Sequence, residues 1–445
     1  MTLVLHNTAT GRKAPFEPLD AKTVRMYVCG LTVYGYAHVG NARPAVVFDI
    51  LARLLRHLYG DAHVTYATNV TDIDDKIMAK AAEEGASVRA VAERYTAAYS
   101  EDMAALNVLE PDIFPKATET MDAIIDMIAR LVDRGCAYEA EGHVLFNVPA
   151  MADYGKLSHR DRDEMVAGAR VEVAPYKKDP ADFVLWKPSS DDQPGWDSPW
   201  GRGRPGWHIE CSAMIERHLG ETIDIHGGGL DLVFPHHENE IAQSECAHDA
   251  PFVRYWLHNG MLNMKGEKMA KSVGNVAAVR DLLAEFPGEA IRLALLAGHY
   301  RAPLDFSRDI LGEAKRRLDR WYRIAGDVER AETVPDPVIA ALEDDLNTPK
   351  AIAALEELAR PETANALKAG AQFLGLLERS AEDWFKSAGG NALLSGERVE
   401  EKILARAEAR ARKDFAAADK IRDELAQAGI RLLDRPDGST DWERT

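Results

Sequence analysis

This 445-residue sequence has only four cysteines and no uncharged apolar run long enough to cross a bilayer. Four cysteines in so long a chain do not make a disulfide framework. Metal binding or catalysis is therefore the better interpretation of any cysteine in a suitable context. The first residues contain no basic segment followed by a long apolar stretch, so we expect no signal peptide and a cytoplasmic location.

The common phosphate-binding glycine loops are also missing. No G-x-G-x-x-G or G-K-[ST] follows the first predicted strand, at residues 24–28. The dinucleotide-binding and P-loop interpretations therefore lose their main support.

Positive charge is outnumbered, because 54 lysines and arginines stand against 72 acidic residues and the formal net charge is −18. This does not exclude a nucleic-acid partner, since phosphates respond to local basic surface rather than to total charge. Residues 401–445 hold ten lysines and arginines against ten acidic residues, so residues 1–400 carry the whole excess of negative charge. We therefore expect an RNA contact in the tail.

The apolar pattern near the start predicts a βαβ unit. A strand over residues 24–28 ends at Cys29-Gly30, apolar residues recur at helical spacing over 38–59, and a second strand covers 63–70. Two strands joined through a helix favour a parallel sheet covered by helices. We predict an α/β fold with a Rossmann-like catalytic domain.

Four ligand-type side chains make the first chemical constellation: Cys29, Cys211, His236 and Glu240. His236 and Glu240 are four residues apart, so one helical face presents both. Thiolate, imidazole and carboxylate are ligands that zinc accepts. Two alternatives stay open: the cysteines could be buried only for packing, and His237 could equally be the ligand.

His38-Val39-Gly40-Asn41 stands where the first long helix should begin. A helix N-terminus offers backbone N–H groups to phosphate, and Gly40 lets a nucleotide approach the backbone. The His38 imidazole can stabilise charge developing on phosphorus. A histidine that only caps the helix is the alternative.

Two lysines, Lys268 and Lys271, stand on a predicted loop flanked by Gly266 and Gly274. Lysine is a movable point charge that can neutralise a departing pyrophosphate. The alternative is that both lysines are ordinary solvated surface residues.

Taken in order, these elements resemble the signatures of class I aminoacyl-tRNA synthetases. Residues 38–41 resemble the HIGH motif and residues 268–272 resemble KMSKS. Longer stretches narrow the resemblance to the cysteinyl-tRNA synthetases, and it runs from about residue 3 to the end. These stretches are MYVCG (26–30), NVTDIDDK (69–76), GWHIECSAM (206–214), DIHGGG (224–229), FPHHENEIAQS (234–244) and the closing segment 414–442.

The resemblance implies roles for individual residues. One zinc ion per chain is expected on Cys29, Cys211, His236 and Glu240, and His38, Lys268 and Lys271 are expected to be catalytic. The amino-acid pocket is expected at Gly30, Thr71, Trp207 and His226. The ATP contacts are expected at His38, Gly40, Asn41, Gly228, Gly229, Asp231, Lys268, Lys271 and Ser272.

Four positions depart from the family pattern. Leu31 stands where the family often has proline, Gly35 where it usually has aspartate, Asn41 in place of the last histidine of HIGH, and Ala270 in place of the first serine of KMSKS. None of these departures removes a charged group that we assign to catalysis.

The resemblance also implies a division of the chain. The expected parts are the first half of the catalytic domain (1–115), a connective insertion (116–205), the second half with the zinc-site residues (206–265), the KMSKS loop and stem-contact region (266–315), an anticodon-binding helical bundle (316–400) and a small C-terminal tRNA-binding domain (401–445). We expect the insertion to begin as a helix and then turn irregular. Residues 401–426 should form one amphipathic helix, followed by a hairpin.

The implied activity is activation of L-cysteine by Mg·ATP and transfer of cysteine to the 3′-terminal ribose of tRNA(Cys), by a monomer without a membrane partner. Pocket shape separates such isosteres as cysteine and serine by only about 10–200-fold. Zinc could select the substrate, because a coordinated thiol deprotonates and a hydroxyl competes poorly. The alternatives are an ATP-dependent cysteine:amino-sugar ligase with the same core and a non-catalytic RNA- or metal-binding protein; the tail at 401–445 favours the synthetase.

Overall fold

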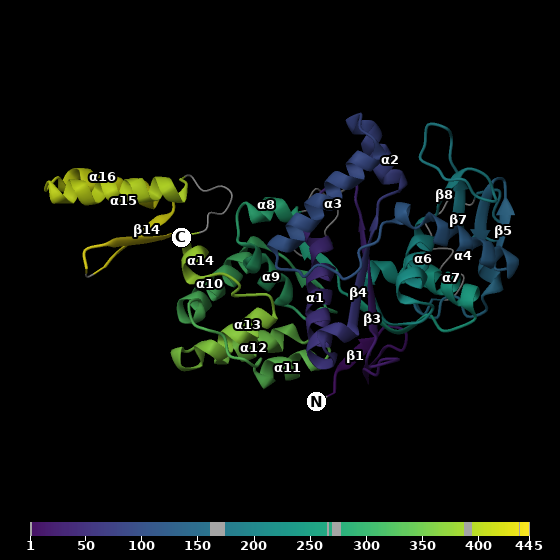
Figure 1. The fold of residues 1–445 in the computed structure, drawn as a ribbon, viewed down its shortest axis with the longest axis horizontal. Helices are drawn as coiled ribbons and strands as arrows, with labels where there is room; N and C mark the ends of the chain where they lie inside the picture. Colours follow the sequence, from purple (N-terminus) through teal and green to yellow (C-terminus); the bar gives the residue numbers. More distant parts are fainter. Residues whose placement is uncertain are drawn as a thin grey trace.

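The computed structural model describes residues 2–160, 174–264, 267–268, 277–386, 394–435 and 437–444. Figure 1 shows an elongated arrangement, with a small sheet and its helices at one end, the main sheet and a helical bundle in the middle, and a helical arm with a hairpin at the other end. No helix in these ranges is long and apolar enough to span a membrane.

The main sheet has the strand order β10-β9-β3-β4, and every neighbouring pair is parallel. Its strands are β3 (Val24–Thr32), β4 (Val64–Thr71), β9 (Ile223–Gly229) and β10 (Val253–Asn259). The strands are largely buried, as expected for a parallel sheet that helices cover on both faces. The predicted α/β fold with a parallel sheet is confirmed.

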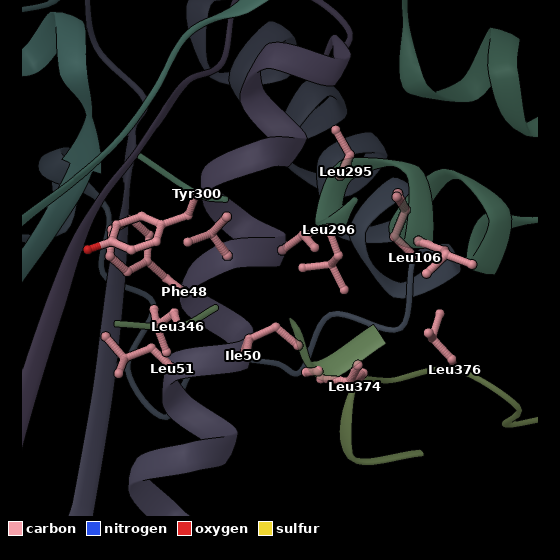
Figure 2. Close-up of a cluster of buried hydrophobic side chains, with 14 of the residues drawn as sticks. Phe48, Ile50, Leu51, Leu106, Leu295, Leu296, Tyr300, Leu346, Leu374 and Leu376 are labelled. Carbon is pink, nitrogen blue, oxygen red and sulfur yellow. The ribbon is translucent and has the colours of Figure 1, made fainter. Parts of the chain in front are cut away.

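Helix α1 (Val39–Tyr59) connects β3 to β4 and ends at Gly60, whose φ of 93° is unfavourable for other residues. Its apolar side chains are buried because the helix lies between the sheet and the bundle. Figure 2 shows Phe48, Ile50 and Leu51 of this helix beside leucines that come from later parts of the chain. One continuous core therefore fixes the start of α1 relative to the strands.

The insertion contains helix α4 (Met121–Asp133) and a four-stranded antiparallel sheet. The strands are β5 (Ala137–Ala140), β6 (His143–Phe146), β7 (Phe183–Pro188) and β8 (Gly203–Pro205). The prediction that this region turns irregular after its first helix is wrong. Its strands are only three to six residues long, too short for a clear alternation of apolar and polar residues.

The other elements extend the sheet domain and build the bundle. Those of the sheet domain are β1 (Val4–Asn7), β2 (Arg12–Pro15), α2 (Asp75–Glu84), α3 (Val88–Ala105), α6 (Trp207–Leu219), α7 (Glu238–His248), β11 (Leu262–Met264), β12 (Glu267–Lys268) and β13 (Leu304–Asp305). The helices that follow are α8 (Val279–Leu283), α9 (Gly288–Leu296), α10 (Arg308–Ala325), α11 (Asp336–Glu343), α12 (Thr348–Glu357), α13 (Ala364–Phe373) and α14 (Ala381–Lys386).

A buried ion pair joins α1 to α9. Arg292 donates to the carboxylate of Asp49, and both side chains are fully buried. The same guanidinium donates to backbone carbonyls of Leu374, Leu106 and Asn107. Burial alone would raise the pKa of Asp49, but the neighbouring guanidiniums outweigh it and hold that pKa below its usual value. The pair therefore connects the bundle to α1, the helix that begins at the motif of residues 38–41.

The C-terminal arm consists of α15 (Gly396–Ala411), α16 (Phe415–Gln427), β14 (Ile430–Asp434) and β15 (Thr440–Arg444). The predicted hairpin is confirmed. The prediction of one helix over 401–426 is wrong, because Lys413 takes a positive φ of 61° and Asp414 caps a second helix. The arm has its own small core, and Trp442 is buried in it.

Candidate active site and metal cluster

A cavity of about 400 Å³ lies at the carboxyl ends of the parallel strands, which is where open α/β sheets bind their ligands. Eight of the predicted site residues line it: Cys29, Gly30, His38, Gly40, Asn41, Trp207, Gly229 and Asp231. The cavity therefore brings the start of α1, the end of β9 and the start of α6 into one site.

The start of α1 is held in shape by its own residues. The Asn41 side-chain oxygen accepts from the backbone N–H of His38 at 3.2 Å, and the Asn41 N–H donates to the His38 carbonyl at 2.8 Å. Asn41 therefore secures the helix terminus, while Gly40 leaves the backbone accessible at the cavity wall.

Gly30 is a position where only glycine fits. A Cβ added there would lie 1.7 Å from the backbone oxygen of Asn69. The Gly30 N–H donates to the Asn69 side-chain oxygen at 2.8 Å, which joins the ends of β3 and β4. Close strand contact at this point shapes the floor of the cavity beside Cys29.

The four predicted metal ligands meet beside the cavity, and their ligand atoms all lie within 4.8 Å of one another. Cys29 Sγ is 3.7 Å from Cys211 Sγ and 3.3 Å from Glu240 Oε1. His236 Nε2 is 3.1 Å from the same carboxylate oxygen. The residues come from β3, from α6, from the π-helical turn Val233–His237 and from α7.

These residues fit a zinc ion. Two sulfur ligands at about 2.3 Å in tetrahedral geometry should lie about 3.8 Å apart, close to the observed 3.7 Å. The Glu240 side chain is fully buried, and among the described residues no lysine or arginine lies within ion-pair distance of it. Because a buried carboxylate needs a compensating charge, a divalent cation at this place is favourable.

Burial controls the protonation of the cluster. Burial raises the pKa of the Cys29 thiol, and the neighbouring Cys211 and Glu240 side chains raise that same pKa further. Burial lowers the pKa of His236 and of His237 well below the usual value. Both imidazoles are therefore neutral, which is the form that binds metal, and a bound cation would favour the thiolates.

A second overlapping group shares Cys29 and Glu240 but replaces the other two ligands by His226 and His237. His226 Nε2 is 2.9 Å from Glu240 Oε2, and the ring stacks on Trp256 at 4.5 Å between centroids. His237 Nδ1 is 2.8 Å from His258 Nε2. Only the first group contains two thiols.

Trp207 connects the cavity to the cluster. Its ring stacks on the His236 ring with centroids 4.1 Å apart, while the residue remains 39% exposed and lines the cavity. Thr71 is buried behind this wall and donates its hydroxyl to Glu210 Oε2 at 3.0 Å. Thr71, His226 and Gly228 are not among the residues that line the cavity.

The lysine motif is only partly placed. Lys268 is the last residue of strand β12, which pairs with β11, so the backbone of this lysine belongs to the sheet domain. Lys271 and Ser272 lie outside the described residues.

Sequence reasoning assigned no role to two cations that line the cavity, Arg43 and Lys76. Arg43 is buried, and its guanidinium donates to the carbonyls of Gly260, Met261, His299 and Ala302. Lys76 lies on α2, and its ammonium is 5.4 Å from the ring centroid of Tyr34. The stretch NVTDIDDK contained Lys76, but nothing in it showed that this side chain reaches the cavity.

Residues 15–316 match the family described as "tRNA synthetases class I (C) catalytic domain", and residues 337–382 match the DALR domain. Two solved class I structures share the fold at low identity. A methionyl-tRNA synthetase of Mycobacterium tuberculosis, in complex with methionyl-adenylate, has a TM-score of 0.56 and 16% identity over 80% of this chain and 90% of its own. A LeuRS of Agrobacterium radiobacter K84 has a TM-score of 0.55 and 12% identity over 97% of this chain and 91% of its own.

Curated relatives match the whole chain. The cysteine–tRNA ligase of Parvibaculum lavamentivorans is 60% identical, over 99% of this chain and 98% of the relative. That of Paramagnetospirillum magneticum is 57% identical over 100% of both chains. Because the family match covers the catalytic core and such relatives match from end to end, the chain belongs to the cysteine–tRNA ligase family of class I aminoacyl-tRNA synthetases.

Proposed function

We propose that this chain activates L-cysteine with ATP and transfers it to the 3′-terminal ribose of tRNA(Cys). One observation carries the proposal: Cys29 belongs both to the cavity wall and to the metal cluster. A substrate in this cavity therefore has the N-terminus of α1, which can bind phosphate, on one side. On the other side it has the metal cluster, which can select a thiol. Family membership supports the same reaction.

The first step needs positioning rather than a protein nucleophile. A carboxylate oxygen of cysteine attacks the α-phosphorus of Mg·ATP, the bond to the β-phosphate oxygen breaks, and pyrophosphate leaves. The N–H groups at the start of α1 and the His38 imidazole stabilise charge on the phosphates. Lys268 and Lys271 follow the departing pyrophosphate. We assign Gly228 and Gly229, at the end of β9, and Asp231, in the short helical turn that follows it, to the nucleotide.

We assign the metal to Cys29, Cys211, His236 and Glu240, because two thiols at tetrahedral spacing suit zinc better than one. His226 then orients Glu240 through its hydrogen bond, and His258 orients His237. Bound zinc supplies a soft cation that prefers a thiolate to a hydroxyl and so separates cysteine from serine. Trp207 closes the wall of the amino-acid pocket next to His236. Thr71 supports this pocket from behind that wall.

The second step brings tRNA to the cavity. Attack by the 2′-hydroxyl of the terminal ribose on cysteinyl-adenylate releases AMP. We assign the acceptor end to the insertion (116–205) and the region at 266–315, and the anticodon to the bundle (316–400) and the small domain (401–445). The catalytic domain is then made of 1–115 and 206–265. We further propose that the chain is a monomer in the cytoplasm.

The test uses purified protein with two assays. Cysteine-dependent ATP–pyrophosphate exchange and charging of purified tRNA(Cys) are both expected. Exchange without charging, but with consumption of an amino sugar, would replace this function by a cysteine:amino-sugar ligase. Absence of exchange in zinc-loaded protein would contradict any activation of cysteine.

A further inference from the structure

Six side chains beside the cavity form two groups of rings and cations, one of which, Tyr34 with Lys76, lines the cavity itself. They are Tyr34, Tyr36, Lys76, Arg94, Tyr95 and Arg280, and we call this set the rim platform. Tyr34 and Tyr36 come from the loop between β3 and α1, and the others come from α2, α3 and α8. Figure 1 shows α2 above the upper end of β4; α3 packs against α2, and α8 packs against α3.

Tyr36 is the exposed ring of the rim platform. This residue is 48% exposed, although two other side chains of the rim platform contact its ring. The guanidinium of Arg280 lies 4.1 Å from its centroid, and Tyr95 meets it edge to face at 5.2 Å and 84°. Arg94 lies 4.7 Å from the centroid of Tyr95. An exposed aromatic ring held in one orientation is prepared for stacking at little entropic cost.

Lys76 supplies the free charge of the rim platform. Arg94 pairs with Glu84, and Arg280 pairs with Asp102 at 3.1 Å, so these two guanidiniums are already neutralised. Lys76 makes no ion pair with the carboxylates of the described residues, although Asp75 beside it pairs with Lys187 and Arg204 of the insertion. Lys76 is exposed and also lines the cavity.

We propose that the rim platform binds the single-stranded 3′ end of tRNA, with a base stacked on Tyr36 and a backbone phosphate on Lys76. This inference rests on the proposed function, because the terminal ribose must reach the cavity to accept cysteine. Unpaired RNA bases are recognised by stacking on aromatic rings and guanidinium planes, and phosphates by cations. The second cavity-lining cation, Arg43, is held by four backbone carbonyls, which leaves Lys76 for a phosphate.

The experiment compares intact tRNA(Cys) with the same tRNA lacking its three 3′-terminal nucleotides. Equilibrium affinity is measured for the wild type, Tyr36→Ala, Tyr36→Phe and Lys76→Met over a series of salt concentrations. Lys80→Met is the matched control, because Lys80 lies on the same helix but pairs with Glu83 and Glu84.

Tyr36→Ala should weaken binding of intact tRNA by about fivefold or more, as expected for loss of one stacked base, and should leave the trimmed tRNA almost unaffected. Tyr36→Phe should restore the affinity because it keeps the ring. Lys76→Met should reduce the slope of log affinity against log salt by about 0.7 for intact tRNA only. Lys80→Met should match the wild type in every measurement.

Charging and ATP–pyrophosphate exchange are measured on the same variants, and Tyr36→Ala should lower charging much more than exchange. Equal weakening of intact and trimmed tRNA, or equal loss of exchange and charging, would overturn the inference and leave the proposed function intact. Failure of the wild type to exchange in the presence of cysteine would instead refute the proposed function.

Discussion

Replacing Cys211 by alanine should greatly weaken zinc binding. Cys211 is buried and is one of the four proposed ligands, with its sulfur 3.7 Å from that of Cys29. Four-ligand structural zinc sites bind with about 10–16 kcal/mol, so an equal share per ligand is about 2.5–4 kcal/mol. The affinity for zinc should therefore fall by about 70- to 900-fold.

The assay is competition for zinc with a chelator of known affinity, together with thermal unfolding to show that the variant is folded. Cys246→Ala is the matched control, because Cys246 is a half-buried cysteine on α7 that lies in neither candidate ligand group. The control should retain about one zinc per chain. A further pair, His236→Ala and His237→Ala, separates the two groups. If Cys211→Ala kept zinc as tightly as the wild type while His237→Ala lost it, the second group would hold the metal.

Three further outcomes are expected. Lys271→Ala should slow adenylate formation in pre-steady-state kinetics much more than it weakens cysteine binding, because its charge meets the phosphates as pyrophosphate leaves; unchanged activation would make Lys271 a surface lysine. Deleting residues 394–445 should raise the KM for tRNA in charging and leave ATP–pyrophosphate exchange nearly intact, because the arm has its own core; equal loss of both reactions, with a lower Tm, would indicate a packing role. Asp49→Asn should cost about 3–5 kcal/mol of unfolding free energy in denaturant titrations, since it leaves Arg292 buried without its counter-charge. Because the folded-state pKa of Asp49 is depressed, its contribution is present above the unfolded pKa of about 3.9 and is lost as pH falls through the folded pKa, so the variant should lose that part of the acid dependence.

Local pattern was sufficient for the sheet domain. Strand β3, helix α1 and strand β4 were predicted because apolar periodicity over residues 24–70 is strong and the joints are short. The insertion was harder, since β5 and β6 have four residues each and alternate poorly. The break between α15 and α16 was missed because Lys413, rather than glycine, takes the positive φ.

The metal cluster shows what spacing can and cannot predict. The separation of His236 and Glu240 by one helical turn is a local signal, and the structure places both in the cluster. The meeting of Cys29 with Cys211, 182 residues away, depends on β9 lying next to β3 in the sheet and α6 packing over it. No local pattern encodes that strand order, and only the family resemblance indicated it.

The rim platform could not have been predicted from the sequence. Its residues come from one loop and three helices, and each is ordinary in its own stretch. Their relation appears only when α3 and α8 come together beside the loop that precedes α1. Sites built from long-range packing of exposed side chains leave no spacing signal.

X-ray absorption at the zinc edge of the purified protein tests the selection of cysteine most directly. We expect two sulfur neighbours at about 2.3 Å without amino acid, three after addition of L-cysteine, and two after addition of L-serine. An unchanged sulfur count with L-cysteine at saturating concentration would contradict direct recognition of the substrate thiolate by the metal on Cys29, Cys211, His236 and Glu240.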